Sequence, residues 1–507
     1  MKLSELLFPG EYRSASDAET ITVRGLSCHT DRVEPGFLFI CLRGTHFDSR
    51  TLIGKIAEAG ACAVITEYGT LPLDMASIPV FEVKNARAAL ATVYSRFYKN
   101  PADSMTVIGI TGTNGKSSTA AILYGILRHS GKHAALIGTV DCLIDDRRYS
   151  LPEEDGGNRL RTMTTPDPDI LYPMLASMRD EGTEYVVMEV SSHALALSKV
   201  SPIRFKLAVF TNLSPEHLDF HDTMENYLAA KAVLFRQADI GIFNGDDLYA
   251  EDLIATSACR IVRTGIIWQG DARATDIVLR GSRGVSYTYI SENARMRVHL
   301  PLPGDFSVCN SLLALQAATE LGLRPSDILP ALSELRPVPG RLERLPLPSS
   351  ADFSVFIDYA HTEEALRVLL NSVRRFRQHD ERIVLLFGCG GDRDRTKRAA
   401  MGHVAEELSD FLIITSDNSR SEDPAAIIAE IRAGTVKKEK QIVIKNRKSA
   451  IEYAILNARP KDIILLCGKG HETYEIDRRG IRHFDEREIV RAALEKRKNG
   501  DTVLHEN

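Results

Sequence analysis

The sequence predicts an α/β protein of three domains, built on parallel sheets. Continuous apolar runs such as 185–190 and 207–211 are typical of parallel strands buried on both faces. Helical patterns alternate with these runs, as they do in P-loop ATPase-like and doubly wound, Rossmann-like sheets. A chain of 507 residues is too long for one hydrophobic core, and its length indicates about three domains.

Composition narrows the class of protein. The net charge is −5 and no basic block stands out, which argues against a nucleic-acid partner. The 8 cysteines are far apart and form no Cys-x-x-Cys pair, as expected for reduced thiols in the cytosol. No signal-peptide pattern occupies the first residues, and no apolar run could span a bilayer. We expect a cytoplasmic monomer without a membrane partner.

Residues 1–100 are expected to form a small α/β domain. Strands are predicted at 36–42 and 61–65, with a helix over 52–59 between them. A second helix, 86–98, ends at an Asn-Pro pair and should lead into the next domain.

Residues 101–336 should form the central domain, which begins with a candidate phosphate-binding loop. An apolar run, 107–111, enters a glycine-containing turn, and a helical pattern follows at 120–127. In that setting Lys116 would reach the β/γ-phosphates of a nucleotide and Ser117 would hold Mg²⁺, although Ile110 stands where the strict motif has glycine. The loop residues expected to contact the nucleotide are Gly112, Thr113, Asn114, Gly115, Lys116, Ser117 and Ser118.

Three further groups in this domain could carry chemistry. Glu189 ends a buried run and could hold Mg²⁺, with Ser191 on a phosphate or sugar, or it could be an ordinary surface residue. His217 and His221 are four residues apart among acids, which fits metal or phosphate contacts but is not a zinc motif. Lys231 has apolar helical neighbours, and its ordinary interpretation is a snorkelling lysine.

A second doubly wound domain is predicted for residues 337–507. The alternating interval 261–302 precedes it and suggests an antiparallel insert at the edge of the central sheet. The segment 337–340, Pro-Val-Pro-Gly, is a plausible linker. Buried strands are then expected at 355–358, 383–388, 411–415 and 463–468.

Polar clusters follow three of these strands, at 388–394, 416–420 and 468–472. Loops at the carboxyl ends of parallel strands line one crevice. Arginines pair with carboxylates and acids accept an ammonium, so the clusters suit a zwitterion such as an amino acid. One charged loop could arise by chance, whereas three at equivalent positions favour a binding site.

Together these motifs resemble the Mur ligases of peptidoglycan synthesis, and most closely the MurE type. The resemblance covers nearly the whole chain, through ordered blocks at 111–116, 164–166, 188–195, 217–221, 227–235, 339–343, 358–362, 387–394 and 468–472. It implies a UDP-sugar domain (1–100), an ATP domain (101–336) and an amino-acid domain (337–507). It also implies an ATP-dependent ligase that adds a diamino acid to UDP-N-acetylmuramoyl-L-alanyl-D-glutamate through an acyl phosphate.

The resemblance also assigns roles to single residues. Ser117, Glu189, His217 and a carbamylated Lys231 would be linked to Mg²⁺, and Lys116, Lys231 and His217 would be catalytic. The remaining ATP contacts would be Asn310, Arg341 and Asp358. The UDP-sugar peptide would meet Thr30, Thr164, Thr165, Ser191 and Lys199. The diamino acid would meet Arg393, Asp417, Asn418, Ser419, Arg420, Gly468 and Glu472.

The chain departs from the family pattern at a few positions. His29-Thr30-Asp31 stands where Asp-Ser-Arg is usual, so Thr30 would have to replace a serine hydroxyl toward uridine. Met163 replaces an asparagine, and Lys199 stands where arginine is common. Meso-diaminopimelate enzymes typically read Asp-Asn-Pro-Arg where this chain has Ser419 in place of proline but keeps Arg420. Meso-diaminopimelate is therefore the expected substrate, with L-lysine and L-ornithine as alternatives.

Two other functions are compatible with parts of the pattern. A folylpolyglutamate synthetase uses similar ATP and carbamyl-lysine chemistry, but the first domain and Thr164-Thr165-Pro166 count against it. A non-catalytic nucleotide-sugar binder would not need a full set of catalytic residues, which this chain retains as Lys116, Glu189, His217 and Lys231.

Overall fold

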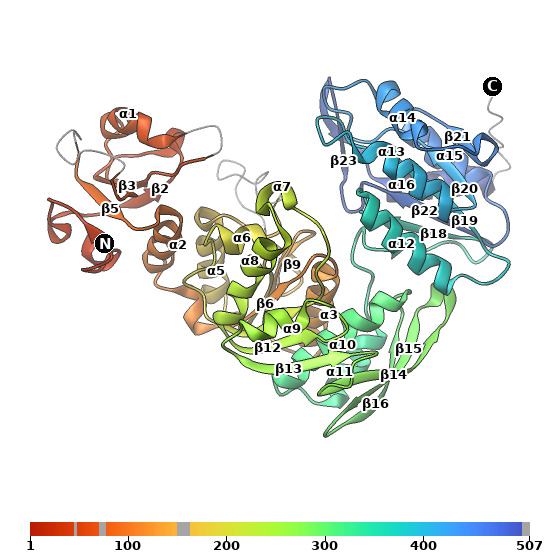
Figure 1. Ribbon diagram of the computed structural model, residues 1–507, viewed down its shortest axis with the longest axis horizontal. Helices are drawn as coiled ribbons and strands as arrows, with labels where there is room; N and C mark the ends of the chain where they lie inside the picture. The colour runs from red at the N-terminus through yellow and green to blue at the C-terminus, as the bar shows by residue number, and fades with distance from the viewer. Residues whose placement is uncertain (45–47, 70–77, 150–162, 499–507) are drawn as a thin grey trace. The chain divides into compact units, whose positions relative to one another are not determined.

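The computed structural model (Figure 1) describes residues 1–44, 48–69, 78–149 and 163–498. It divides into two compact units, Met1–Arg273 with Asn310–Ile328 and Ala274–Cys309 with Leu329–Asn507. The division into three domains stays a prediction. Within the described ranges, no helix has both the length and the apolar character needed to cross a membrane.

The first unit begins with a five-stranded sheet in the order β1-β5-β4-β3-β2, parallel except for β1. The two strands and two helices expected before residue 100 are present. The bounds are β1 Tyr12–Arg13, β2 Gly25–Ser27, β3 Phe37–Ile40, α1 Ile53–Glu58, β4 Ala63–Glu67, β5 Val80–Val83 and α2 Ala86–Phe97. Alternate residues of β3 and β4 pack into two hydrophobic cores, one on each face.

A parallel sheet with β6 (Thr106–Thr111) near its centre forms the rest of the first unit. Its strands run in the order β13-β12-β11-β6-β10-β7, all parallel, with β8 and β9 antiparallel beyond β7. This order places β10 and β11 on either side of β6, so the loops after all three strands lie at one edge of the sheet. The other bounds are β7 Ala134–Ile137, β8 Cys142–Ile144, β9 Arg147–Arg148, β10 Tyr185–Glu189, β11 Phe205–Phe210, β12 Ala238–Asn244 and β13 Arg260–Gly265.

Helices cover this sheet and connect its strands. They are α3 Lys116–His129, α5 Pro168–Asp180, α6 Ser192–Ala196, α7 Leu218–His221, α8 Met224–Arg236 and α9 Ala250–Ala255. Further along the chain lie α10 Asp305–Glu320 and α11 Pro325–Ser333. The predicted P-loop-like arrangement of strand, loop and helix is confirmed at β6 and α3.

The expectation of an antiparallel insert over 261–302 is partly wrong. β13 is a parallel strand, and β14 (Ala272–Leu279) begins parallel to it. Only β15 (Val285–Ser291) and β16 (Arg295–Leu300) form an antiparallel hairpin. The alternation of apolar residues is strong only in 285–300, whereas the mixed burial of β13 shows no clear period.

The second unit contains a six-stranded sheet in the order β17-β18-β22-β19-β20-β21, parallel except for β17. All four predicted strands are present. The strands are β17 Glu343–Arg344, β18 Ser354–Asp358, β19 Arg382–Phe387, β20 Phe411–Ile414, β21 Gln441–Val443 and β22 Asp462–Cys467. The helices are α12 Glu363–Phe376, α13 Lys397–Leu408, α14 Pro424–Ala433, α15 Arg447–Leu456 and α16 Glu486–Lys498, and β23 (Tyr474–Asp477) and β24 (Gly480–His483) form a hairpin.

Both faces of this second sheet are buried, which confirms a doubly wound domain. Alternate residues divide between two cores: Phe356 and Leu385 pack with α12, α13 and α14, whereas Val355 and Leu386 pack with α15 and α16. The strand order makes β22, β19 and β20 neighbours. The three polar clusters predicted to follow these strands therefore share one edge of the sheet.

Candidate active site

The phosphate loop lies between β6 and α3. Gly115 caps α3 with a φ of +85°, and α3 begins at Lys116. The Lys116 Nζ donates to the backbone carbonyl oxygens of Gly112 (2.9 Å) and Thr113 (2.7 Å). These bonds hold the ammonium against the loop, at the positive end of the α3 dipole, where an anion is stabilised.

Neighbouring side chains leave no room for a side chain at Gly112 or Gly115 of the loop. A Cβ added at Gly112, whose φ is +153°, would lie 1.9 Å from Thr211 Oγ1. A Cβ at Gly115 would lie 2.5 Å from Asn310 Oδ1, so Asn310, expected to contact ATP, packs directly against the loop. Thr211 Oγ1 donates to the Asn114 carbonyl at 2.6 Å, and the Asn114 N–H donates to Asn212 Oδ1 at 2.9 Å. Both Thr211 and Asn212 follow β11 and brace the loop, although the sequence assigned them no role.

Glu189 and Ser117, expected to lie at Mg²⁺, are brought together. The Ser117 hydroxyl donates to Glu189 Oε2 at 2.9 Å, and Glu189 is buried. Thr139 donates two further hydrogen bonds to the Glu189 carboxylate, one from the Thr139 N–H (2.8 Å) and one from the Thr139 hydroxyl (3.1 Å). A carboxylate and a hydroxyl at the N-terminus of α3 are suitable oxygen ligands for Mg²⁺. Thr139 was not predicted, because nothing in the sequence connects the turn after β7 with the end of β10.

Lys231 is not a snorkelling lysine, so its ordinary interpretation is wrong. Its side chain on α8 is 1% exposed, and Nζ donates to the Gly112 carbonyl at 3.0 Å. That same carbonyl accepts from Lys116. Nζ also lies 4.4 Å from the ring centroid of Tyr227, whose hydroxyl is 3.1 Å from Thr113 Oγ1. Burial, reinforced by the charge of Lys116, holds the pKa of Lys231 well below its ordinary value.

His217 lies beside a group of aromatic rings at the start of α7. Its φ is +57°, its ring centroid is 4.8 Å from that of His193, and its side chain is 47% exposed. Burial lowers the pKa of His217, with Lys116 and Lys231 acting in the same direction against Glu216. Burial and the neighbouring histidines lower the pKa of His193 to about 4. A neutral imidazole with an available lone pair is the form that binds a metal or accepts a proton.

Four residues expected to contact the UDP-sugar peptide lie around the end of β10. The Thr165 hydroxyl donates to the Glu189 carbonyl at 2.9 Å and accepts from the Ser191 N–H at 3.0 Å. Thr164 Oγ1 lies 3.0 Å from the Thr139 hydroxyl oxygen, within hydrogen-bond distance. Lys199 Nζ lies 2.8 Å from Asp167 Oδ1 and donates to the Thr165 carbonyl at 3.4 Å. These contacts connect the surroundings of Glu189 with the cationic side chain of Lys199.

Thr30 lies between β2 and β3, in the N-terminal part of the same unit. It is exposed and begins a short 3-10 helix, Thr30–Arg32. Next to it, His29 Nε2 lies 3.2 Å from Asp169 Oδ2 in the first turn of α5, and Cys28 places its sulfur within 4.8 Å of both groups. His29 thus connects the end of β2 with α5.

The second unit holds Arg341 and Asp358, both expected to contact ATP. The Asp358 carboxylate accepts the N–H groups of Leu342 (2.7 Å) and Ala360 (2.8 Å). Burial raises its pKa, although the Arg341 charge and these bonds oppose the shift. Among the described residues, none accepts a hydrogen bond from the buried Nε of Arg341, whose guanidinium carbon lies 5.2 Å from the Tyr359 ring centroid.

The predicted amino-acid residues converge at the ends of β20 and β22. Asn418 Nδ2 donates to Glu472 Oε2 at 2.8 Å, and Lys469 Nζ donates to Asn418 Oδ1 at 2.9 Å. A Cβ at Gly468, whose φ is +113°, would lie 2.6 Å from Asp417 Oδ2. Burial raises the pKa of Asp417, but Lys469 and Arg447 outweigh it and lower the pKa overall.

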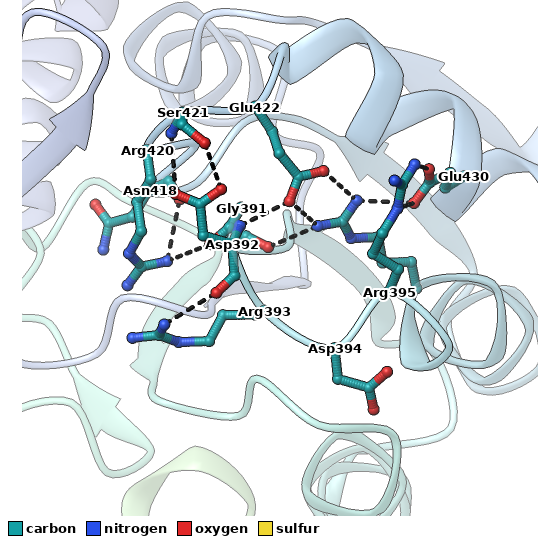
Figure 2. Close-up of polar contacts among 12 residues, drawn as sticks. Gly391, Asp392, Arg393, Asp394, Arg395, Asn418, Arg420, Ser421, Glu422 and Glu430 are labelled. Atoms are coloured by element: carbon teal, nitrogen blue, oxygen red, sulfur yellow. Dashed lines mark hydrogen bonds and ion pairs between the residues drawn. The ribbon is translucent and has the colours of Figure 1, made fainter. Parts of the chain in front are cut away.

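The loop after β19 completes this group with Arg393 and meets the Ser419–Arg420 segment. Arg420 Nη1 donates to the Gly391 carbonyl at 2.8 Å, and Arg393 Nη1 donates to the Asp392 carbonyl at 3.0 Å (Figure 2). Sequence reasoning missed two buried cations here, Lys469 and Arg447. Lys469 stands within a predicted cluster, whereas Arg447 comes from α15, far along the chain, and binds Glu486 at 2.8 Å.

The site has two parts: a phosphate loop beside a carboxylate–hydroxyl pair, and a separate doubly wound domain that gathers arginines, amides and acids. Together they define an ATP-dependent ligase. Residues 110–318 match the Mur ligase middle domain, and residues 340–470 match the glutamate ligase domain of Mur ligases. The chain belongs to the Mur ligase family, and within it to the MurE type.

The relatives found for this chain extend over nearly its whole length. A UDP-N-acetylmuramoyl-L-alanyl-D-glutamate--2,6-diaminopimelate ligase of Caldanaerobacter subterraneus subsp. tengcongensis is 39% identical, covering 97% of this chain and 99% of the relative. The Bacillus cereus protein of the same name is 37% identical, with 95% and 96% covered. A solved structure of a ligase with this name has a TM-score of 0.71 at 27% identity, covering 98% of this chain and 99% of that one.

A folylpolyglutamate synthase of Mycobacterium tuberculosis shares the fold. Its TM-score is 0.60 at 17% identity, and the match covers 82% of this chain and 95% of that one. The folylpolyglutamate synthetase alternative is not favoured, because relatives of the MurE type match at higher identity and along more of the chain.

Proposed function

We propose that this enzyme joins meso-2,6-diaminopimelate to UDP-N-acetylmuramoyl-L-alanyl-D-glutamate, at the cost of one ATP, as a monomer in the cytoplasm. The main support is the convergence of Arg393, Arg420 and Glu472 at neighbouring strand ends. The names of the relatives at 35–39% identity agree with this substrate.

In the first step a carboxylate oxygen of the substrate attacks the γ-phosphorus of ATP. An acyl phosphate forms and ADP leaves, which converts a poor electrophile into a reactive one. We assign Lys116 to the β/γ-phosphates, and Asn310, Arg341 and Asp358 to the rest of ATP. Lys199 and Ser191 would hold the UDP-sugar peptide, whose terminal carboxylate must approach the phosphate loop, and Thr30 would contact uridine.

The residues around Ser117 and Glu189 fit a Mg²⁺ site. They offer a hydroxyl and a carboxylate at 2.9 Å from each other, and His217 could supply a neutral nitrogen. When bound, Mg²⁺ offsets the negative charge that the phosphates and the substrate carboxylate bring together. A carbamate on Lys231 would add an anion at the phosphate loop.

In the second step the amine of the diamino acid attacks the acyl carbon. A tetrahedral intermediate forms, phosphate leaves, and the amine loses a proton as the amide is completed. We assign Arg393 to one carboxylate of diaminopimelate and Arg420 to the distal carboxylate, because bidentate pairing suits arginine. Glu472 and the Gly468 carbonyl would receive the distal ammonium, beside Asp417, Asn418 and Ser419.

Competition between amino acids tests this assignment. Phosphate release with the UDP-muramoyl dipeptide should be faster with meso-diaminopimelate than with L-lysine or L-ornithine. The kcat/KM ratio should approach roughly 10⁴, since a site that binds a polar substrate group rejects analogues lacking it. A preference for L-lysine would overturn the role of Arg420, and turnover with a folate substrate would overturn the reaction.

A further inference from the structure

Two loops of the second unit interlock around Arg420. The loop after β19 packs against the segment after β20, where the Gly391 N–H donates to the Asn418 carbonyl at 2.9 Å. A Cβ at Gly391 would lie 2.0 Å from the Ser419 carbonyl oxygen, so only glycine allows this approach. Arg420 Nη1 donates back to the Gly391 carbonyl at 2.8 Å. The direction of the Arg420 guanidinium therefore depends on where the first loop is held.

Asp392 connects the two loops a second time. Its carboxylate accepts from the N–H of Ser421 (3.2 Å) and from the Ser421 hydroxyl (2.5 Å), as Figure 2 shows. Its own N–H donates to Glu422 Oε1 at 2.6 Å. Asp392 and Arg420 have φ values of +53° and +50°, a left-handed conformation that residues other than glycine adopt rarely. Such conformations persist where surrounding contacts enforce them.

Arg398 connects the two loops through its buried guanidinium. Its side chain is 0% exposed, and its two terminal nitrogens donate to the Glu422 carboxylate at 2.9 and 2.8 Å. It also donates to Glu430 at 2.7 Å and to the Gly390 carbonyl at 3.1 Å. The Arg398 hydrogen bond lowers the pKa of Glu422 to about 2, so Glu422 is an anion under ordinary conditions. One buried guanidinium thus holds a residue of each loop.

We propose that Arg398, Glu422 and Asp392 form a loop clamp that positions Arg420 and so sets the selection of diamino acids that carry a distal carboxylate. None of the three needs to touch the substrate. They are positioning residues, because each bonds to the backbone of one of the two loops. Arg398 donates to the Gly390 carbonyl, Glu422 accepts from the Asp392 N–H, and Asp392 accepts from the Ser421 N–H. This inference rests on the proposed role of Arg420.

Glu422→Gln is the sharpest test of the loop clamp. The amide keeps the size of the side chain, but one oxygen becomes an NH₂ group that cannot accept from Arg398 or from the Asp392 N–H. We expect the KM for meso-diaminopimelate to rise about 10- to 100-fold, the loss of a charge-assisted hydrogen bond, with kcat and the KM for ATP nearly unchanged. The preference for meso-diaminopimelate over L-lysine should fall by a similar factor.

Arg395→Gln is the matched control, because Arg395 also pairs with Glu430 but its side chain is 64% exposed. It should leave the KM for the diamino acid unchanged. Ser421→Ala, which removes only the hydroxyl bond to Asp392, should raise that KM by a smaller factor than Glu422→Gln. Thermal unfolding of each variant establishes that it is folded.

The outcomes separate the clamp from the proposed function. If the unmodified enzyme prefers meso-diaminopimelate and folded Glu422→Gln keeps both KM and preference, the loop clamp is refuted and the function stands. If the unmodified enzyme prefers L-lysine, the substrate assignment is refuted before any variant is measured. An equal rise in the KM values for ATP and the diamino acid would indicate general loosening and would also refute the clamp.

Discussion

Replacing Lys116 by alanine should reduce ligation by at least on the order of 10²–10³-fold, the usual cost of removing one preorganised group that stabilises transition-state charge. Lys116 places its ammonium within 2.9 Å of two loop carbonyls, at the N-terminus of α3. Negative charge grows on the β/γ-phosphate oxygens as the γ-phosphoryl group transfers, and the helix dipole cannot replace a full positive charge there.

Phosphate release measured with saturating substrates tests this expectation, with nucleotide binding followed separately. The fold should survive, because the side chain lies on the loop rather than within a hydrophobic core. Lys206→Ala is a suitable control, since Lys206 on β11 is 51% exposed and pairs with Asp239. Near-normal turnover in folded Lys116→Ala would refute the phosphate-loop assignment.

Periodicity and turn chemistry predicted most of the fold. The buried strands of both parallel sheets read as continuous apolar runs, since each is covered by helices on both faces. The short edge strands β17 and β21 were not predicted. Glu343–Arg344 and Gln441–Val443 are polar or only partly buried, so neither shows the apolar run of a central strand.

The candidate site was predicted where its residues follow a strand or form a local motif. Lys116 and Ser117 are local to one loop, and Glu189 directly ends β10. The residues that support them were missed because tertiary structure supplies them. Thr139 reaches Glu189 from 50 residues away, and Arg398 reaches Glu422 from 24 residues away. No local pattern distinguishes such residues from ordinary surface threonines and arginines.

Lys231 shows that the role of a lysine depends on its burial, which the sequence alone does not give. On the sequence it is one lysine on an apolar helix, for which snorkelling is the usual behaviour. The structure instead places its amine within the phosphate loop, where it shares the Gly112 carbonyl with Lys116. Two ammonium groups on one acceptor repel each other, so the neutral amine of Lys231 is favoured, which is the form that the proposed carbamylation requires.

Replacing Lys231 by alanine should remove most of the ligase activity and leave an activity that short carboxylic acids partly restore. The neutral amine attacks CO₂ to give a carbamate and a proton, which turns a cation into a carboxylate-like anion beside the proposed Mg²⁺ site. Formate or acetate could enter the space left by the truncated side chain and supply that anion. Full activity of Lys231→Ala without additives would show that Lys231 contributes only to packing.

Lys231→Met is the control that separates loss of the anion from loss of packing. Methionine fills much of the space but cannot be carbamylated, so this variant should be inactive and should not respond to formate. Nuclear magnetic resonance of the protein under ¹³C-labelled CO₂ gives a second readout, with a carbamate signal expected in the unmodified chain and absent from both variants. Rescue of Lys231→Met by carboxylates would contradict the proposal.

The pH dependence of carbamylation follows from the lowered pKa of Lys231. Only the neutral amine reacts with CO₂, so at limiting CO₂ the carbamate signal and the activity should rise with pH through the amine's pKa, which lies well below 10.5. Between that pKa and 10.5 the unfolded chain binds more protons at Lys231 than the folded chain, so without CO₂ stability should also rise with pH. Lys231→Met should lose this contribution to the pH dependence of its thermal unfolding, and an unchanged profile would show that the folded chain buries Lys231 without lowering its pKa.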